Sequence, residues 1–256
     1  MKPFRALICL AFLLPLKLWA QTFYPGYVIT NNGDTLKGYV KYHETVLNPK
    51  VAEFKTEPNG TERIYQAAEV RYFSINVAYP LDVQLEFQRY SGPISMNDIN
   101  INTVTTERDT SFKIDAIFLK VLRKDKRLSL YSYDDQLKTR FFIADGQSAP
   151  VELIYRIYLK NDISNGNNTK NEDTYKKQFI ALATKYGKLD DELMRRLDKI
   201  DYSEKYMIQM VDKINGFTGP DPTMGSSAAS PPKAKLLIML AAFAGVAILM
   251  FSVMHK

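Results

Sequence analysis

Cysteine and histidine are almost missing from this 256-residue chain, which contains one cysteine, Cys9, and two histidines, His43 and His255. A disulfide needs two cysteines, and the usual zinc sites need several cysteine or histidine ligands, so neither can form within one chain. A serine-histidine-aspartate triad would have to use His43, because His255 directly follows the long apolar run 236–254. No Gly-x-Ser-x-Gly elbow accompanies His43, so we interpret it as a surface residue of a turn.

Runs of five or six like charges are absent as well, and the glycines stand singly at turns. Nucleic-acid binding needs a basic stripe, and a phosphate loop needs clustered glycines. The formal net charge is +6, but three of the 34 basic residues (Lys2, Arg5 and Lys17) precede residue 20. Without them, 31 basic residues face 28 acidic ones, a net charge of +3. The sequence therefore predicts no nucleic-acid partner, no metal site and no cofactor.

One long uncharged run is present, residues 236–254, in which Ser252 is the only polar side chain. Its nineteen residues would extend about 28 Å as a helix, close to the ~30 Å of bilayer hydrocarbon. We predict that residues 236–254 form a single transmembrane helix, with at most two residues beyond it on the cytoplasmic side. A face of small residues suited to close helix packing is formed by Ala241, Ala242, Ala244, Gly245 and Ala247.

Residues 1–20 have the three parts of a secretory signal: a basic start, an apolar run, and Ala20 before a cleavage site. We expect cleavage after Ala20; an uncleaved anchor is the alternative, because Leu18 is bulkier than the usual residue at that position. Cys9 lies inside this segment, so the mature chain contains no cysteine. An exported chain without disulfides is typical of a bacterial envelope, and we expect the periplasmic side of a Gram-negative membrane.

Residues 21–160 are predicted to form an antiparallel β domain. Two β-rich runs flank Asn32-Gly33, the strongest short-range signal for a hairpin. About nine or ten short apolar runs are separated by turn residues, which favours an antiparallel sandwich or a partly open barrel. Residues 114–123 are apolar on both faces, so we place them in the middle of the sheet. Residues 91–111 are polar and form either a binding loop or a weakly paired edge strand.

A linker, residues 161–171, is predicted to lead into a short α-helical segment, residues 172–215, with a helical apolar period. Gly187 is expected to close a first helix, and Asp201 with Glu204 resembles a capping box that opens the last one. This segment is either an appendage packed on the β domain or on itself, or a coiled-coil stalk. A flexible Gly/Pro/Ser tether, residues 216–235, then leads to the membrane helix.

Carboxylate pairs are the remaining candidates for catalysis, because a glycosidase needs only two acids. We interpret Asp134-Asp135 as a hairpin turn and Asp190-Asp191-Glu192 as the first turn of a helix. Asn97, Asp98 and Asp109 lack the regular spacing of a calcium loop. No residue is therefore assigned to a catalytic, cofactor-binding or metal site. A candidate sugar- or peptide-binding patch consists of Phe23, Tyr24 and Tyr27.

One stretch carries a resemblance: Gly26-Tyr27-Val28-Ile29, Asn32-Gly33-Asp34-Thr35-Leu36 and Gly38-Tyr39-Val40. It resembles the start of a group of exported β-rich bacterial envelope proteins that are themselves uncharacterised. In those proteins a signal precedes a strand, an Asn-Gly-Asp-Thr turn and a glycine-containing strand. The resemblance implies an envelope location and no activity.

From the sequence we expect a membrane-tethered interaction or structural module of the cell envelope, with an envelope protein or glycan as its partner. This expectation leans away from an enzyme, because no catalytic constellation is present. One alternative is a carboxylate-based hydrolase that acts on envelope glycan. The other is an accessory subunit that contacts a membrane complex through residues 236–254.

Overall fold

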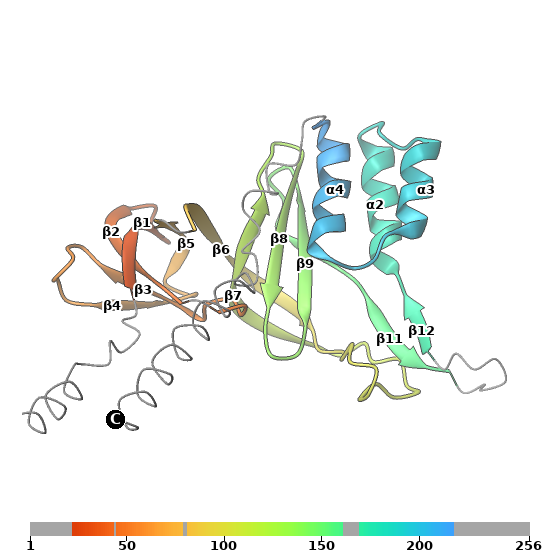
Figure 1. The fold of residues 1–256 in the computed structure, drawn as a ribbon, viewed down its shortest axis with the longest axis horizontal. Helices are drawn as coiled ribbons and strands as arrows, with labels where there is room; N and C mark the ends of the chain where they lie inside the picture. The colour runs from red at the N-terminus through yellow and green to blue at the C-terminus, as the bar shows by residue number, and fades with distance from the viewer. Residues whose placement is uncertain (1–21, 44, 79–80, 161–168, 218–256) are drawn as a thin grey trace, which may run out of the picture. The chain divides into compact units, whose positions relative to one another are not determined.

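The structure, a computed structural model, describes residues 22–43, 45–78, 81–160 and 169–217. The chain divides into two compact units: residues 22–77 and 84–217 belong to the first, and Ala78 and residues 81–83 are the described part of the second. In the described residues, two β-sheets and three short helices are present (Figure 1).

The larger sheet has ten strands in the order β10-β9-β8-β7-β6-β5-β1-β2-β3-β4. Its strands are β1 (Thr22–Thr30), β2 (Thr35–Tyr42), β3 (Val51–Lys55), β4 (Arg63–Gln66), β5 (Val70–Val77), β6 (Val83–Ser95), β7 (Phe112–Arg123), β8 (Leu128–Asp134), β9 (Thr139–Asp145) and β10 (Val151–Leu153). The smaller sheet pairs β11 (Arg156–Leu159) with β12 (Thr169–Glu172), and the helices are α2 (Thr174–Lys185), α3 (Asp191–Lys199) and α4 (Glu204–Asn215).

A short connection forces the first half of the large sheet to curl. β4 ends at Gln66 and β5 begins at Val70, yet β1, β2 and β3 lie between them in the hydrogen-bonding order. In a flat sheet, four strand spacings would separate β4 from β5 by roughly 19 Å, whereas four residues of extended chain reach about 14 Å. The sheet therefore bends round, and the Asn31 N–H in the β1–β2 turn donates to Glu69 O at 3.3 Å.

Two glycines allow this close approach. Gly26 of β1 faces Gly38 of β2 in the ladder. A Cβ atom on Gly26 would collide with Ser74 O, and one on Gly38 would collide with Lys55 O. Glycine inside a strand often marks such a site, where another backbone passes unusually close.

The second half, β6 to β10, also curls. Three strands separate β6 from β10 in the sheet. Nevertheless, the Ser95 N–H at the end of β6 donates to Glu152 Oε2 of β10 at 2.9 Å. The ring of Tyr90 in β6 lies 4.9 Å from that of Phe142 in β9. Between these strands lies an inner apolar cluster: Tyr90, Ile94, Ile117, Leu119, Tyr131, Phe142 and Ala144.

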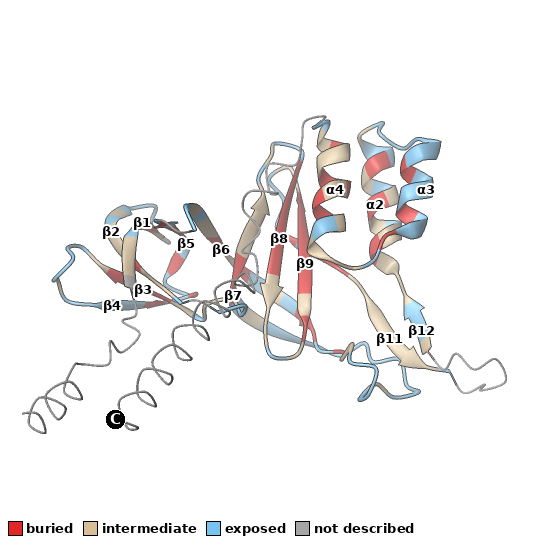
Figure 2. Ribbon diagram, in the orientation of Figure 1, coloured by how far each residue is buried: buried red, intermediate tan, exposed pale blue. Residues whose placement is uncertain are grey.

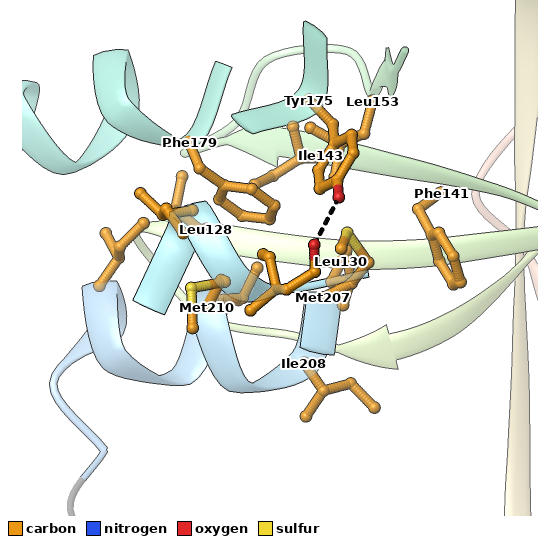
Figure 3. Packing of buried hydrophobic residues seen from close by; sticks show 14 of the residues in the cluster. Leu128, Leu130, Phe141, Ile143, Leu153, Tyr175, Phe179, Met207, Ile208 and Met210 are labelled. Carbon is orange, nitrogen blue, oxygen red and sulfur yellow. Dashed lines mark hydrogen bonds between the residues drawn. The ribbon is translucent and has the colours of Figure 1, made fainter. Parts of the chain in front are cut away.

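The helices cover the other face of β8 and β9, so most residues of both strands are buried (Figure 2). Alternate side chains of a strand point to opposite faces. Leu130 and Phe141 therefore pack on the helices, while Tyr131 and Phe142 belong to the inner cluster. Figure 3 shows this helix-facing core, in which the Tyr175 hydroxyl donates to Ile200 O at 2.9 Å.

The mainly β antiparallel fold followed by short helices is confirmed, and the helical segment packs on the β domain rather than forming a free stalk. Gly187 follows the first helix with a positive φ of 61°. The cap expected at Asp201 is wrong: α4 begins at Glu204 with Ser203 as its N-cap. Residues 169–171, placed in the linker, and Glu172, placed in the helical segment, form β12 instead.

The strand expected over residues 114–123 is present as β7, but it is not covered along its whole length. The β7–β8 register pairs Lys120 with Ser132, so β8 ends beside Phe118 and leaves the start of β7 without this neighbour. Ile114 is consequently 67% exposed. Of the long segment 91–111, the first five residues extend β6 and the rest is a loop.

No helix among the described residues is long and apolar enough to cross a membrane. The predicted signal, residues 1–20, and the predicted transmembrane helix, residues 236–254, lie outside the described residues.

The last residue of α4 fastens this helix to the sheet, and its loss should be measurable. Asn215 Oδ1 accepts from the Leu128 N–H at 3.1 Å, and its Nδ2 donates to Leu128 O at 2.9 Å. Because Leu128 is fully buried, Asn215→Ala would leave both backbone groups without partners, at a cost of about 1–3 kcal/mol. We expect the urea midpoint to fall accordingly, and Lys188→Ala, on an exposed turn, to leave it unchanged. An unchanged midpoint for Asn215→Ala would contradict this role.

Candidate functional site

A pocket of about 460 Å³ lies among β1, β5, β6 and the turn after β7. We call it the basic-aromatic pocket; its lining residues are Tyr27, Ile29, Arg71, Tyr72, Gln88, Arg89 and Lys124. Three of these seven side chains are cationic and two are tyrosines, whereas none is acidic. The lining thus combines positive charge with aromatic surface.

Strand register brings the two tyrosines together. β1 runs antiparallel to β5 with Ile29 opposite Tyr72 and Tyr27 opposite Ser74. Tyr27 and Tyr72 are therefore diagonal neighbours on one face, where aromatic side chains reach each other. Their rings stack at 5.9 Å between centroids with an interplanar angle of 25°. Val28, between Tyr27 and Ile29, points the other way and is fully buried.

Among the residues that the structure describes, the cations around this stack have no carboxylate partner. Lys124 Nζ lies 5.1 Å from the centre of the Tyr72 ring, within cation–π range. Arg89 Nη1 donates to Asn31 Oδ1 at 3.1 Å. Within the described residues, none of Arg71, Arg89 and Lys124 forms an ion pair. Their charge is therefore available to an anionic ligand.

Tyr72 stays a neutral phenol in this setting. Burial raises its pKa, and the hydrogen bond that its hydroxyl makes to the Glu86 carboxylate raises it further. The Tyr72 hydroxyl is therefore occupied by Glu86 and is not a free donor for a ligand. An aromatic face beside unpaired guanidinium groups suits a ligand that carries negative charge on a planar or ring-shaped body.

Only Tyr27 of the three aromatic residues proposed from the sequence reaches this pocket. Tyr24 lies on the opposite face of β1, and its ring makes an edge contact with Tyr42 at 6.1 Å. Phe23 shares the face of Tyr27 but lies under Lys55, whose Nζ is 4.4 Å from the ring centre. No local sequence pattern points to Tyr72 or the three cations, because they come from separate elements.

A second pocket, of about 450 Å³, contains three carboxylates, and we call it the carboxylate pocket. Asp115, Asp134 and Asp135 line it together with Lys50 and Lys113. Burial raises the pKa of Asp134. A hydrogen bond from Lys113, whose Nζ lies 2.7 Å from the carboxylate, lowers the pKa of Asp115.

The pKa of Asp135 is shifted in the opposite direction from that of its neighbour Asp134. Burial alone would raise its pKa, but the Lys138 backbone N–H and the Arg140 guanidinium, 3.0 Å away, together hold it below the usual value. The predicted turn is confirmed: Asp134 pairs with Thr139, and Asp135 Oδ1 accepts from the Leu137 N–H at 2.9 Å. The pocket therefore holds carboxyl groups whose pKa values are pushed apart.

The other candidate residues have structural roles. Asp190 is the N-cap of α3, with Oδ1 accepting from the Leu193 N–H at 2.6 Å, and Asp191 and Glu192 occupy the first turn as expected. His43 is 39% exposed, with Nε2 3.5 Å from the Glu53 carboxylate.

The residues considered for calcium do not converge. Asp98 and Asp109 accept from the backbone N–H groups two residues on, Asn100 and Ser111, each at 2.8 Å. Asn97 is buried and accepts from Lys138 Nζ instead. In the described ranges, no three His, Cys, Asp or Glu side chains are placed to hold a metal ion.

Sequence reasoning also missed a buried polar cluster made of Ser95, Asn97, Lys138, Arg140 and Glu152. Lys138 Nζ donates to Asn97 Oδ1 at 2.6 Å, and Arg140 Nε donates to Ser95 O at 2.9 Å. The Ser95 N–H and hydroxyl both donate to the Glu152 carboxylate. No local sequence pattern predicts this cluster, because its residues come together only where β6 closes onto β10.

Comparisons with known proteins add no assignment to these sites. No family model matches the chain, and neither the curated proteins nor the solved structures contain a significant match. The residues and their geometry are therefore the basis for any functional proposal.

Because Lys138 is buried, we expect the free energy of unfolding to rise with pH above neutrality. Burial lowers its pKa from 10.5 to about 8. Between these values the unfolded chain holds a proton that the folded chain does not, so the penalty of burying Lys138 is relieved as pH rises. Wild type should therefore gain about 2 kcal/mol relative to Lys138→Met between pH 7 and pH 9.5. Urea unfolding at both pH values measures this difference, and a constant difference would contradict a depressed pKa.

Proposed function

We propose that this protein is an interaction module of the cell envelope that binds an anionic ligand in the basic-aromatic pocket. One observation carries the proposal: Arg71, Arg89 and Lys124 surround a stacked tyrosine pair, and none of the three has a carboxylate partner among the described residues. Three cations without carboxylate partners among the described residues favour an external anion as the group that neutralises them.

The scaffold supports a binding role. We infer that each half of the large sheet is a partly open barrel, as one of the two architectures favoured by the sequence. The β4–β5 connection closes the first half, and the hydrogen bond from Ser95 to Glu152 closes the second. The pocket takes Tyr27 and Tyr72 from the first half and Gln88, Arg89 and Lys124 from the second. A site built on strands is held in a fixed shape.

The ligand class follows from the lining. Tyrosine rings pack against the apolar face of a sugar ring, and arginine binds carboxylates and phosphates through charge-assisted hydrogen bonds. An acidic saccharide combines both features. It also agrees with the glycan partner expected from the sequence.

The envelope location rests on the sequence. The signal-like residues 1–20, the apolar residues 236–254 and the resemblance to exported β-rich proteins support export and tethering of the β domain on the periplasmic side. Contact with a membrane complex through residues 236–254 stays a prediction of the sequence.

Binding of an acidic oligosaccharide tests the pocket. We expect Arg71→Ala and Lys124→Ala each to weaken binding of an oligouronate by roughly 10–100-fold, because each removes a charge-assisted contact worth about 1.5–3 kcal/mol. Isothermal titration of the purified full-length chain provides the affinities, and binding should weaken as salt is raised.

Matched controls separate the pocket from general surface charge. Lys188→Ala and Arg195→Ala remove exposed cations far along the chain, on the helical segment, and should leave the affinity unchanged. A neutral oligosaccharide of the same length should bind much more weakly. Equal affinity for the neutral and acidic oligosaccharides, or equal losses in all four variants, would refute the proposal.

The carboxylate pocket favours a second candidate function, hydrolysis of an envelope glycan. Acid–base catalysis uses neighbouring carboxyl groups whose environments push their pKa values apart, as they do for Asp134 against Asp115 and Asp135. Asp134, with its raised pKa, would be the general acid, and one of the other two the base or nucleophile.

If this candidate is correct, Asp134→Asn should slow release of reducing ends from envelope glycan by about 100-fold or more. Asp191→Asn, at the exposed start of α3, is the matched control and should retain full activity. Absence of any release by the wild-type chain, or equal rates in wild type and Asp134→Asn, would leave binding as the function.

A further inference from the structure

A third pocket, of about 590 Å³, lies at the seam where β6 closes onto β10, next to α2 and β11. We call it the seam pocket. Its volume is within the 300–1,000 Å³ typical of small-molecule sites. It shares no lining residue with the basic-aromatic pocket, so an inference about it goes beyond the proposed function.

Three exposed apolar side chains gather at this pocket. Phe112, Ile114 and Val151 are 64%, 67% and 58% exposed, and all three line it. Single exposed apolar residues are ordinary, but a group around one concavity marks a binding surface. Phe112 and Ile114 are exposed because β8 does not extend along the start of β7.

The polar groups of the pocket are largely occupied by internal bonds. Both carboxylate oxygens of Glu152 accept from Ser95. The Gln178 side-chain amide makes the hydrogen bonds that a neighbouring strand would make at the edge of β10. Its Nε2 donates to Glu152 O and its Oε1 accepts from the Ile154 N–H, both at 2.9 Å. This amide occupies backbone groups at the β10 edge that would otherwise be open to an added strand.

Arg156 has a donor without a partner among the described residues. Its Nη1 pairs with the Glu172 carboxylate at 2.9 Å, which Arg108 also holds through two bonds of 2.6 and 2.7 Å. Its Nε is buried and has no hydrogen-bond partner within the part of the chain that the structure describes. The pKa of Glu172 is lowered to about 2, with the bond from Arg108 as the first cause, so this carboxylate stays ionised and cannot donate.

A second guanidinium, which binds Ser95 of the pocket lining, also has a buried N–H without a partner among the described residues. Arg140 is fully buried and bound to Ser95 O, and its Nη2 also lacks a partner among the described residues. Asp109, near the rim, is already engaged by the Ser111 N–H. A buried guanidinium N–H without an acceptor is costly, and an anionic acceptor compensates it best.

From this geometry we infer that the seam pocket binds an organic anion with an apolar chain, a fatty-acid-like carboxylate. The chain lies against Phe112, Ile114 and Val151, and the carboxylate accepts from Arg156. An apolar wall without a cation would accept alcohols and acids alike, whereas a cation without the wall would favour small ions. The pocket offers both features in one place.

Photolabelling of the full-length chain in isolated membranes tests this inference. The probe is octanoic acid carrying a diazirine, and the matched probes are the corresponding alcohol and amine. After irradiation and digestion, mass spectrometry locates the label. We expect the acid to label residues 110–114 and 149–156 about tenfold more than either matched probe, in keeping with a charge-assisted contact. Excess octanoate should remove that label.

Two variants separate the contribution of the apolar wall to labelling from the contribution of Arg156. Phe112→Ser, at an exposed position outside the core, should reduce labelling by all three probes. Arg156→Gln should bring the acid down to the level of the alcohol while the alcohol itself is unchanged, which shows that the pocket is intact. Ile64→Ser, which alters an apolar residue 53% exposed on β4, is the control and should label as wild type does.

The inference is overturned if acid, alcohol and amine label these residues equally, since that describes an apolar surface for a protein partner. It is also overturned if the label lies elsewhere, or if Phe112→Ser labels as strongly as wild type. If Arg156→Gln also loses alcohol labelling, its pocket is no longer intact. The labelling of Phe112→Ser then decides whether the inference is overturned. None of these results depends on whether the basic-aromatic pocket binds saccharides.

Discussion

The three residues between β4 and β5 oblige the sheet to curl, and much of the molecule follows from that constraint. Strands that are four positions apart in the ladder become neighbours in space. Gly26 and Gly38 stand opposite each other where backbones come too close for a side chain. Both glycines lie in the first hairpin, which β1 and β2 form. Their role in this chain is to allow closure of the sheet rather than to contribute chemistry.

Closure of the second half has a different chemical character. Apolar contacts such as Tyr90 on Phe142 fill the interior, but the seam is fastened by the Ser95–Glu152 hydrogen bonds. A polar seam brings buried charges with it. Lys138 and Arg140 lie in the same cluster, and the low pKa of Lys138 reflects the cost of burying it. The seam therefore includes buried charged side chains, and it borders a pocket.

The helices stabilise this half from outside. β8 and β9 are buried on both faces because α2, α3 and α4 cover the face that the curl leaves outward. Specific polar contacts fix the docking: Asn215 binds the Leu128 backbone, and Arg123 forms a bidentate pair with Asp212 of α4. The helical segment is consequently part of the same core as the sheet. A sequence period of 3.6 shows that a face is apolar but does not say what it packs against.

Local features of this protein were determined by the sequence alone. The Asn32-Gly33 hairpin, the acidic first turn of α3, the Gly187 helix end and the Asp134-Asp135 turn depend on neighbours within a few residues, and each formed where predicted. Exposure of Ile114 was mispredicted because it depends on where β8 ends, not on the residues around Ile114. Only the tertiary structure decided which groups share a pocket. Tyr27, Tyr72 and Lys124 are far apart along the chain, and curling of one continuous sheet brings them together, so no spacing within the sequence could reveal the site.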